Sequence, residues 1–547
     1  MSGRGSMNHL PKLVWVAAAL AALAVSRPAA AAPLTGTVFV DSNQSGSRDT
    51  GEPGLAGVAV SNGREIVETD AAGRYLLPPG PHGRVFLTRP DGFECAVWVR
   101  KGAGDFALVP APRPREFFFI HLSDVHAYRH SSQVWEDYGV VPPYVPTLVA
   151  AWFAVRDFER RLVPRWTDAV IPHLRAALQP YRPTGQSWDL LVPSRYFDEL
   201  FRSGSELGRG EDALRASFEE IHALGPDFLV NTGDIVFDSN RVPAGVSEDW
   251  MSLYRDAAER PGRPVYPSIG NHELGRIEHA DASPDDPMYG PGFFRHHFGT
   301  SVYSFDRGDF HFVALDTHSQ ASGGEDETWR RNRMRPEVKA WLEADLARSS
   351  SRTVVLLNHE PFFEDPDWNM GDEFWEREVV DDEGVLERFG VDYTLTGHVH
   401  LPGIARTGTT THISTGALSG MHWLLPPSVH PRGYRLVYAR EGHLYTVWKR
   451  TGEPVLGLAE ATDAAHVVAV AADRRGPFAR VRLFLDGEPV AIERWGDYFV
   501  HARLEPARLL AETLCLEATR SSGETLVADL TGGDTMQSRS KCQELGN

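Results

Sequence analysis

Residues 117–126 read FFFIHLSDVH and join an apolar run to two side chains of metal-binding type, Asp124 and His126. The run is almost continuously apolar, which is typical of a strand buried on both faces of its sheet. Sites in α/β proteins assemble at the carboxyl ends of such strands. The stretch therefore predicts a polar site at the edge of a buried sheet.

Four later segments repeat this construction, each with an apolar run that ends in metal-binding residue types. They are 228–234 (FLVNTGD), 265–273 (VYPSIGNHE), 354–359 (VVLLNH) and 393–400 (YTLTGHVH). Helical stretches alternate with these runs, so we expect an α/β fold whose sheet is covered on both faces. A lone Asp-x-His or Gly-Asp usually ends a strand or a turn, but chance does not explain five such segments in order.

The side chains that end these runs are imidazoles, carboxylates and one amide, with no thiolate. They are Asp124, His126, Asp234, Asn271, His359, His398 and His400. Such a set suits Mn, Zn or Fe rather than a structural, thiolate-bound zinc. In Asp-x-His and His-x-His, alternate residues of an extended segment point the same way and can reach one site. The set exceeds the needs of one tetrahedral ion and predicts two divalent ions that share a carboxylate.

The ordered blocks D-x-H, G-D, G-N-H-E, H and G-H-x-H resemble the calcineurin-like metallophosphoesterase family over residues 115–402. The resemblance implies a two-sheet αββα core and hydrolysis of a phosphomonoester or phosphodiester by metal-activated water. It assigns Asp124, His126 and His400 to one metal, Asn271, His359 and His398 to the other, and Asp234 to both. It makes His272 the catalytic residue that contacts the phosphate and protonates the leaving oxygen.

One position departs from two branches of that family. Phe237 stands where purple acid phosphatases have a tyrosine and calcineurin-type phosphatases an aspartate. A tyrosinate-bound Fe(III) is therefore not expected. The group that orients His272 stays open, because Asp238 is one position away from the family's aspartate.

Short strands between Gly and Pro clusters predict a small β-sandwich module on each side of the catalytic domain. We place the modules at 33–110 and 455–535 and the catalytic domain at 115–450. This arrangement resembles a bacterial subgroup of the family. Within the catalytic domain, an insertion at about 131–205 is rich in aromatic residues. It forms either a local core or a lid that grips an organic group of the substrate.

The N-terminus has the pattern of a secretory signal peptide, which we place at 1–32. Arg4 and Lys12 precede an apolar run at 13–25, and alanines occupy 29–32. The apolar run is shorter than the roughly 20 residues that span a bilayer. We therefore expect an exported protein, periplasmic or extracellular, with no membrane span after cleavage. In such an oxidising compartment Cys515 and Cys542 either pair or stay free, and Cys95 is left over.

Residues 41–52, DSNQSGSRDTGE, follow the oxygen-ligand spacing of an EF-hand loop, with glycine at its sixth position. The candidate calcium ligands are Asp41, Asn43, Ser45, Ser47, Asp49 and Glu52. The segment also resembles calcium loops of bacterial extracellular B-type repeats. A polar hairpin without an ion is the alternative, since Asp, Asn and Gly are ordinary turn residues.

The charge balance limits the kinds of substrate and partner that we expect the protein to bind. The chain has 55 Lys and Arg against 74 Asp and Glu, a net charge of −19. An acidic surface repels phosphate backbones, so we expect a small or surface-presented phosphoester and no extended nucleic acid. Two divalent ions beside Asp124 and Asp234 would make the site itself locally positive. The alternative is a carbohydrate- or cell-surface-binding protein with a structural metal site. The oligomeric state is not predicted.

Overall fold

The computed structural model describes residues 32–127, 210–240, 242–279, 281–320, 329–330, 333–349, 352–362, 383–420, 432–460, 466–504, 513–530 and 542. The signal peptide, apart from its last residue, and the whole aromatic insertion at 131–205 lie outside these residues. Neither the export signal nor the lid is therefore described by the structure. Within the described ranges, no helix is long and apolar enough to cross a membrane.

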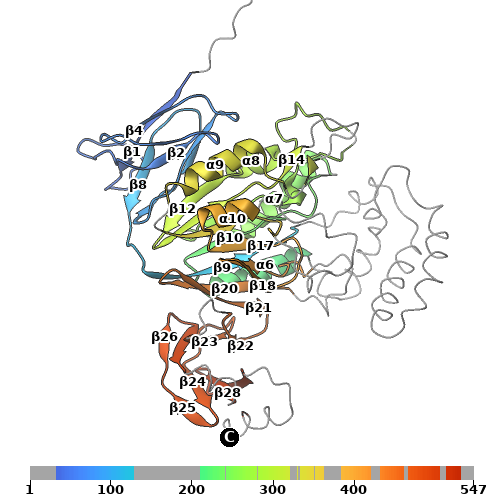
Figure 1. Ribbon diagram of the computed structural model, residues 1–547. Coiled ribbons are helices and arrows are strands. Elements are labelled where there is room, and N and C mark those ends of the chain that lie inside the picture. The colour runs from blue at the N-terminus through green and yellow to red at the C-terminus, as the bar shows by residue number, and fades with distance from the viewer. Residues whose placement is uncertain are drawn as a thin grey trace, which may run out of the picture.

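Two sheets packed face to face form the centre of the molecule (Figure 1). The first has the order β11 (Val265–Pro267), β10 (Phe228–Asn231), β9 (Glu116–Leu122), β20 (Gly433–Arg440) and β21 (His443–Arg450). The second has the order β12 (Tyr303–Arg307), β13 (Phe310–Ala314), β16 (Thr353–Leu357), β17 (Tyr393–Thr396), β19 (Thr410–Ser414) and β18 (Gly403–Thr407). Strands β9, β10 and β11 are parallel, as are β13, β16, β17 and β19.

The apolar runs of the sequence fill the space between these sheets. Phe119 of the first sheet meets Phe312 of the second edge to face, with ring centroids 5.8 Å apart, and stacks on Phe228 at 4.8 Å. Both phenylalanines of the first sheet are fully buried or nearly so. This shared core explains why the strands read as continuous apolar runs rather than alternating ones.

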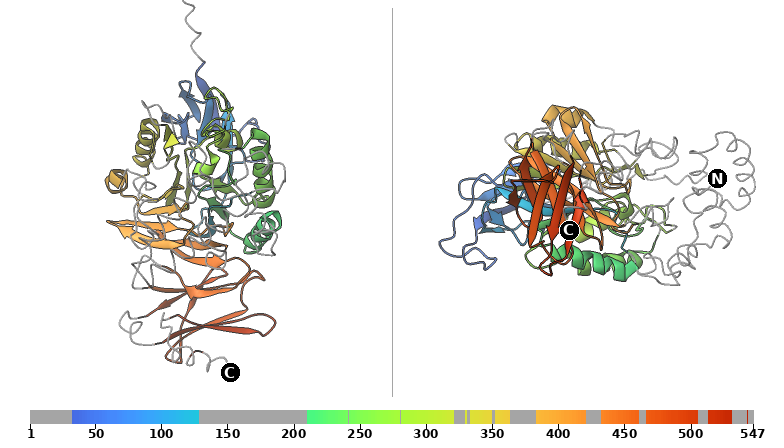
Figure 2. Two further views of the ribbon diagram at one scale, coloured as in Figure 1. Left: turned by 90° about the vertical axis from the view of Figure 1, so that its right-hand side faces the viewer. Right: turned by 90° about the horizontal axis from the view of Figure 1, so that it is seen from below.

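Helices cover the outer faces of both sheets, as Figure 2 shows. Helices α6 (Gly210–Ala223) and α7 (Ala244–Ala258) share a hydrophobic cluster with the first sheet. Helices α9 (Pro336–Leu346) and α10 (Glu383–Phe389) pack into the cluster of the second sheet. The shorter elements are η4 (Asn271–Glu273), α8 (Gly292–Phe298), β14 (Ser319–Gln320) and β15 (Trp329–Arg330). The predicted two-sheet core with outer helices is confirmed.

Two four-stranded sheets form the N-terminal module. One has the order β4 (Arg74–Leu77), β1 (Leu34–Val40), β8 (Phe106–Pro110) and β6 (Phe93–Glu94). The other has the order β3 (Ile66–Glu68), β2 (Ala59–Ser61), β5 (Arg84–Leu87) and β7 (Val99–Lys101). Val38, Val60 and Leu108 belong to the core between them. The module is thus a small sandwich with its own apolar interior.

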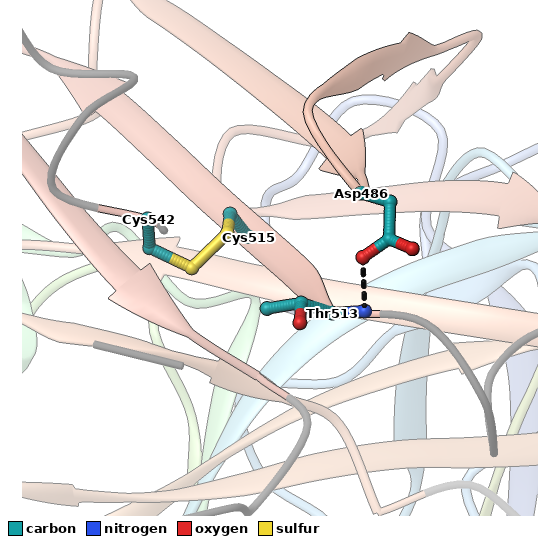
Figure 3. Close-up of a disulfide and its surroundings, with 4 residues drawn as sticks. All are labelled: Asp486, Thr513, Cys515 and Cys542. Carbon is teal, nitrogen blue, oxygen red and sulfur yellow. Dashed lines mark hydrogen bonds between the residues drawn. A yellow bond between two sulfur atoms is a disulfide. The ribbon is translucent and has the colours of Figure 1, made fainter. Parts of the chain in front are cut away.

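The C-terminal module repeats this plan. Its sheets are β22 (Val455–Leu458), β23 (His466–Ala472), β27 (Phe499–Arg503) and β26 (Glu493–Trp495), and β25 (Glu488–Val490), β24 (Arg480–Leu485), β28 (Leu514–Thr519) and β29 (Thr525–Asp529). Cys515 on β28 forms a disulfide with Cys542, their Cα atoms 5.6 Å apart (Figure 3). Cys95 is a free thiol. Of the two alternatives for the late cysteines, the structure contains the paired one.

Candidate metal centre

Five strand ends converge on one polar centre between the two sheets. Strands β9, β10 and β11 bring Asp124, Asp234 and Asn271 from the first sheet. Strands β16 and β17 bring His359 and the segment that contains His398 and His400 from the second. These residues are far apart in the sequence and meet because parallel strands end at the same edge of a sheet.

The first donor group contains Asp124, His126, Asp234 and His400, whose ligand atoms lie within 4.8 Å of one another. His400 Nε2 lies 3.0 Å from Asp124 Oδ1 and 3.2 Å from His126 Nε2. Two ligand nitrogens on one tetrahedral zinc, each about 2.0–2.1 Å from the ion, lie roughly 3.3 Å apart. The spacing of this group therefore fits a single bound cation.

The second donor group contains Asp234, His359 and His398. His359 Nε2 lies 3.1 Å from Asp234 Oδ2 and 3.1 Å from His398 Nδ1. The other ring nitrogen of His359 donates to Thr232 O at 2.7 Å, which fixes the ring and directs Nε2 to the centre. Asp234 is common to both groups, which is the arrangement expected of a carboxylate shared by two ions.

Asn271 supplies an independent test of whether a metal fits. Its side chain is 2% exposed, and within the described part of the chain its Oδ1 atom has no hydrogen-bond partner. A buried, unpaired amide oxygen is costly unless it has a ligand. The donor set, with imidazole, carboxylate and amide atoms and no thiolate, fits two borderline divalent cations.

The backbone at the ligands is not extended, contrary to the expectation for Asp-x-His and His-x-His. Five of the proposed ligands have left-handed φ values: Asp124 (52°), His126 (44°), Asp234 (51°), His398 (67°) and His400 (58°). Both members of each x-separated pair adopt this conformation, so convergence comes from tight turns rather than from strand alternation. Non-glycine residues in this region cost free energy, and such strain concentrates at functional sites.

Three motif glycines allow the turns to approach one another. A Cβ atom on Gly270 would lie 2.3 Å from both the amide nitrogen and Oδ1 of Asp234. One on Gly397 would lie 2.5 Å from Asp124 Oδ2, and one on Gly233 would lie 2.7 Å from His359 Nδ1. Each glycine thus makes room for a ligand from another turn.

Glu273, to which the sequence motifs assign no role, lies under the centre. Its side chain is fully buried, and Oε1 accepts hydrogen bonds from the amides of Ile235 and Val236 at 2.8 and 3.0 Å. Its Oε2 accepts from the amide of Gly270 at 3.0 Å. Glu273 therefore joins the Asp234 turn to the Asn271 turn. The only sequence signal was its fixed place after His272 in the G-N-H-E block.

His272 differs from the proposed ligands because it is partly exposed. Its side chain is 12% exposed, against 2% for that of Asp234, and its Nε2 lies 3.8 Å from Asp234 Oδ2. The main-chain amide of His272 donates to Asp234 Oδ1 at 3.0 Å. This position suits a group that reaches both the centre and an incoming molecule.

The orientation of His272, left open by the sequence, comes from the main chain of 237–239. Its Nδ1 makes a hydrogen bond with the carbonyl oxygen of Phe237. The hydroxyl and the amide of Ser239 donate to the carbonyl of His272 at 2.6 and 3.0 Å. A backbone carbonyl thus stands where calcineurin-type enzymes use a carboxylate, and Phe237 contributes without its side chain.

Burial and mutual charge set the protonation of the centre. Burial alone would raise the pKa of Asp124, but His400 and other imidazoles lower it to about 2. His272 and His359 likewise hold the pKa of Asp234 well below its usual value against the effect of burial. Burial also lowers the pKa of His126, which keeps its ring neutral, the form that binds metals. The centre therefore presents ionised carboxylates and a neutral ring at His126, whereas Asp234 and Asp124 raise the pKa of His359 against the effect of burial, so a bound cation would displace a proton there.

The calcium candidates lie together in a closed loop of the first module. The Asp41 carboxylate accepts from the amides of Ser45 and Gly46 at 3.0 and 2.8 Å. Asp49 Oδ2 accepts from Asn43 Nδ2 and Ser45 Oγ at 2.8 and 2.9 Å. Ser45 Oγ also donates to the Ser47 carbonyl, and Glu52 accepts from the amides of Ser42 and Asp49. All six candidates belong to one network, which fits either an ion or a polar turn.

Comparison with known proteins assigns the chain to a family. Residues 119–402 match the family described as Calcineurin-like phosphoesterase, and residues 42–106 match the N terminal of Calcineurin-like phosphoesterase. The first match covers slightly more than half of the 547 residues, so the chain belongs to the calcineurin-like phosphoesterase family. It is a hydrolase that acts on phosphoester bonds, with a candidate dinuclear metal centre.

Solved structures and one curated protein also match. A dimetal phosphatase from Danio rerio is 15% identical, with 62% of this chain and 97% of that chain covered and a TM-score of 0.35. The purple acid phosphatase PPD1 from yellow lupin is 13% identical, with 73% and 68% covered and a TM-score of 0.31. Colossin-A from Dictyostelium discoideum is 35% identical over 69 residues, which make up 10% of this chain and 1% of that protein. The chain thus spans a very small part of Colossin-A.

Proposed function

We propose that this chain is an exported phosphoesterase that hydrolyses a phosphomonoester or phosphodiester at a centre of two divalent transition metal ions. The observation that carries the proposal is the place of Asp234, which belongs to both donor groups and lies beside the partly exposed His272. Bound there, Mn, Zn or Fe would supply Lewis acidity and lower the pKa of a water molecule toward about 7. The seven buried ligands named above would hold the ions.

The residues of the chain have separate tasks in this reaction. Asp234 belongs to both donor groups and so fixes the distance between them, with its Oδ2 3.8 Å from His126 Nε2 and 3.1 Å from His359 Nε2. His272 is held by Phe237 O at Nδ1, so its Nε2 faces the centre and can protonate the leaving oxygen. The edge-to-face contact of His272 with His126, centroids 4.7 Å apart, keeps the catalytic ring against the first donor group.

The substrate and the location follow from charge and from the N-terminal sequence. The net charge of −19 favours a small or surface-presented phosphoester over a long polyanion. The basic, apolar and small-residue pattern over 1–32 supports export to the periplasm or the cell exterior. Monoester and diester substrates use the same pair of ions, so both are included.

The test is hydrolysis of p-nitrophenyl phosphate and bis-p-nitrophenyl phosphate by the full chain with and without Mn²⁺. We expect turnover of one or both esters that chelation removes and metal restores. Asp234→Asn should remove activity and about half or more of the bound metal, because it weakens both groups, whereas Asp256→Asn on the exposed face of α7 should change neither. A wild-type rate for Asp234→Asn would contradict the proposal. Stoichiometric metal without turnover of any phosphoester would favour the carbohydrate- or surface-binding alternative.

We also propose that the loop at 41–52 binds calcium. Its carboxylates, Asp41, Asp49 and Glu52, already point into one hydrogen-bonded loop with the Ser47 carbonyl at the seventh position. Extracellular calcium modules typically bind at about 10⁻⁴–10⁻³ M. Calorimetric titration of the metal-loaded chain should show one calcium site that Glu52→Gln removes and that Glu65→Gln, an exposed residue of the same module, retains. Absence of heat at millimolar calcium would leave the polar turn as the explanation.

A further inference from the structure

Strand β5 and helix α9 pack together where the N-terminal module contacts the catalytic core, and we call this contact the seam. Phe86 of β5 packs against Trp341 of α9, with ring centroids 6.2 Å apart, and Trp341 Nε1 donates to Ser61 Oγ at 2.9 Å. A parallel bridge between Arg89 and Phe305 continues the contact along the edge strand β12. Helix α9 lies between the parallel strands β13 and β16 in the chain, so it runs antiparallel to both. It therefore runs in the same direction as β12 and β5, which are also antiparallel to β13. The first residues of β5 and α9 therefore lie at the same end of the seam.

Cationic side chains gather at that end from three elements. Arg84 begins β5, where it pairs in register with Lys101 of β7, and Arg335 is the N-cap of α9. Arg295 lies on α8, whose C-cap Gly299 is so close to β7 that an added Cβ would lie 2.5 Å from Val99 Cγ1. Burial and the charges of Arg295, Arg335 and Arg84 lower the pKa of His82, two residues before Arg84, to about 4, and the carboxylate of Asp316 acts against them.

Among the residues that the structure describes, these cations outnumber their counter-ions. Arg335 pairs with Asp316 at 2.8 Å and with Glu337 at 3.1 Å. Arg84 and Arg295 have no hydrogen bond or ion pair from their side chains in the part of the chain that the structure describes. Burial, together with the charges of Arg335 and Arg84, lowers the pKa of Arg295 to about 10. Within the described residues, two arginines without an ion pair thus lie near a third, in a protein whose net charge is −19.

The seam opens at the same edge of the second sheet as the metal centre. Asp316 follows β13, and its Oδ1 lies 3.2 Å from Nδ1 of the fully buried His318. His318 Nε2 lies 2.9 Å from Oε1 of Glu360, the residue after the proposed ligand His359. One buried chain of polar contacts therefore connects the arginine cluster to the second donor group.

We propose that Arg84, Arg295 and Arg335 form a second oxyanion site, for a phosphate or carboxylate group, at the seam between the N-terminal module and the catalytic core. Planar guanidinium groups bind these oxyanions through paired, charge-assisted hydrogen bonds. An oxyanion at this place would neutralise the two unpaired arginines and lie in a setting partly shielded from solvent. The bound group is either free inorganic phosphate or a remote acidic group of the substrate, and the second case rests on the proposed phosphoesterase function.

The first experiment counts phosphate sites on the metal-loaded full chain by calorimetric titration with inorganic phosphate. We expect one phosphate more per chain for the wild type than for the double variant Arg84→Gln/Arg295→Gln. The control Arg474→Gln, an exposed arginine of the C-terminal module, should match the wild type. If the metal centre fails to bind phosphate, the number of phosphates bound per chain falls to one in the wild type and to zero in the double variant. The difference between the two proteins is then unchanged. Equal stoichiometry and affinity in wild type and double variant would overturn the proposal.

Thermal unfolding shows whether a variant loses phosphate binding only because it is misfolded. Without phosphate, Arg295→Gln should unfold at or above the wild-type temperature, since it removes one of three mutually repelling charges. With phosphate, its gain in unfolding temperature should be smaller than that of the wild type or of Arg474→Gln. The unfolding temperature of Arg295→Gln could instead fall below that of the wild type without phosphate, while its gain on addition of phosphate stays at the wild-type value. That result would show that Arg295 has a structural role and would refute the site.

The second experiment identifies the source of the oxyanion. The KM values of a sugar monophosphate and of the matching bisphosphate are compared in wild type and Arg295→Gln. A rise in KM of about tenfold or more for the bisphosphate alone, with kcat unchanged, would place a substrate group at the seam. Equal KM values in both proteins, together with the loss of one phosphate site, would identify free phosphate as the ligand.

Discussion

At the scale of the residue, the centre depends on conformations that most side chains avoid. Five of its proposed ligands have left-handed φ values, and Gly233, Gly270 and Gly397 stand where a Cβ would meet a neighbouring turn. Strain of this kind persists only where the surrounding structure holds it in place. Here Glu273 does so by accepting three backbone amides from the Asp234 and Asn271 turns.

Replacement of Gly270 tests this close approach. Gly270→Ala should displace Asp234 and destabilise the protein by about 1–3 kcal/mol, because the added Cβ meets backbone and ligand atoms. Bound metal should fall with it, as measured by elemental analysis alongside denaturant unfolding. Gly245→Ala at the start of α7, where nothing lies within 4 Å of the new Cβ, is the matched control and should leave both quantities intact. Equal metal content in the two variants would show that the turn tolerates a side chain.

His272 offers a second test, through the leaving group. If His272 protonates the leaving oxygen, as proposed, His272→Asn should keep its metal and lose about 10²–10⁴-fold in kcat with alkyl phosphates. With p-nitrophenyl phosphate, whose leaving group needs little protonation, the loss should be clearly smaller. A uniform loss for both leaving groups would instead indicate a role in binding, and the rates of Ser239→Ala would show how far its clamp on the His272 carbonyl matters.

At the scale of the element, strand ends were predictable and the turns beyond them were not. Continuous apolar runs identified β9, β10, β11, β16 and β17, because buried parallel strands carry no polar alternation. The amino-acid sequence does not reveal the backbone angle φ. Asp-x-His was therefore expected to be extended, although both of its residues have left-handed φ values. Nor could the role of the Phe237 carbonyl be foreseen, since any residue type supplies the same backbone atom.

A buried histidine makes the contacts between strands β12 and β13 and helix α9 depend on pH. His311 on β13 lies 2.7 Å from Asp306 of β12 and 2.9 Å from Asp345 of α9. Burial would lower the pKa of His311, but the two carboxylates raise it to about 9, above the unfolded value of 6.5. Its stabilisation is therefore complete below pH 6.5 and is lost as the pH rises to 9, by about 3 kcal/mol.

The measurement is denaturant unfolding of the wild type and His311→Gln across this range. The variant should be less stable at pH 6 and should lose less stability than the wild type between pH 6.5 and 9. His296→Gln, whose side chain is 58% exposed, should keep the wild-type slope. Parallel curves for wild type and His311→Gln would show that the histidine carries no extra proton in the fold.

At the scale of the whole molecule, the two β-modules are continuous with the catalytic core. The C-terminal module contributes Trp495, Tyr498 and Phe499 to the same hydrophobic cluster as α6, α7 and the first sheet. Tyr498 donates a hydrogen bond to Leu224 O at 3.0 Å, and Trp495 stacks on Tyr438 with centroids 6.0 Å apart. The short-strand pattern of the sequence separated the modules as units but could not show these contacts, of which that between Tyr498 and Leu224 joins residues 274 positions apart.

This shared cluster predicts that the C-terminal module and the catalytic core unfold together. Leu516→Ala lies in the private core of the module, and Trp495→Ala lies at the junction, so each should destabilise by about 2–5 kcal/mol. If the contacts couple the units, both variants lower the calorimetric transition and the temperature at which phosphoesterase activity disappears by similar amounts. An independent module would respond differently, because Leu516→Ala would then produce an early separate transition while activity survived to the wild-type temperature. The two variants distinguish these cases because both side chains are buried, but of the two only Trp495 contacts the catalytic core.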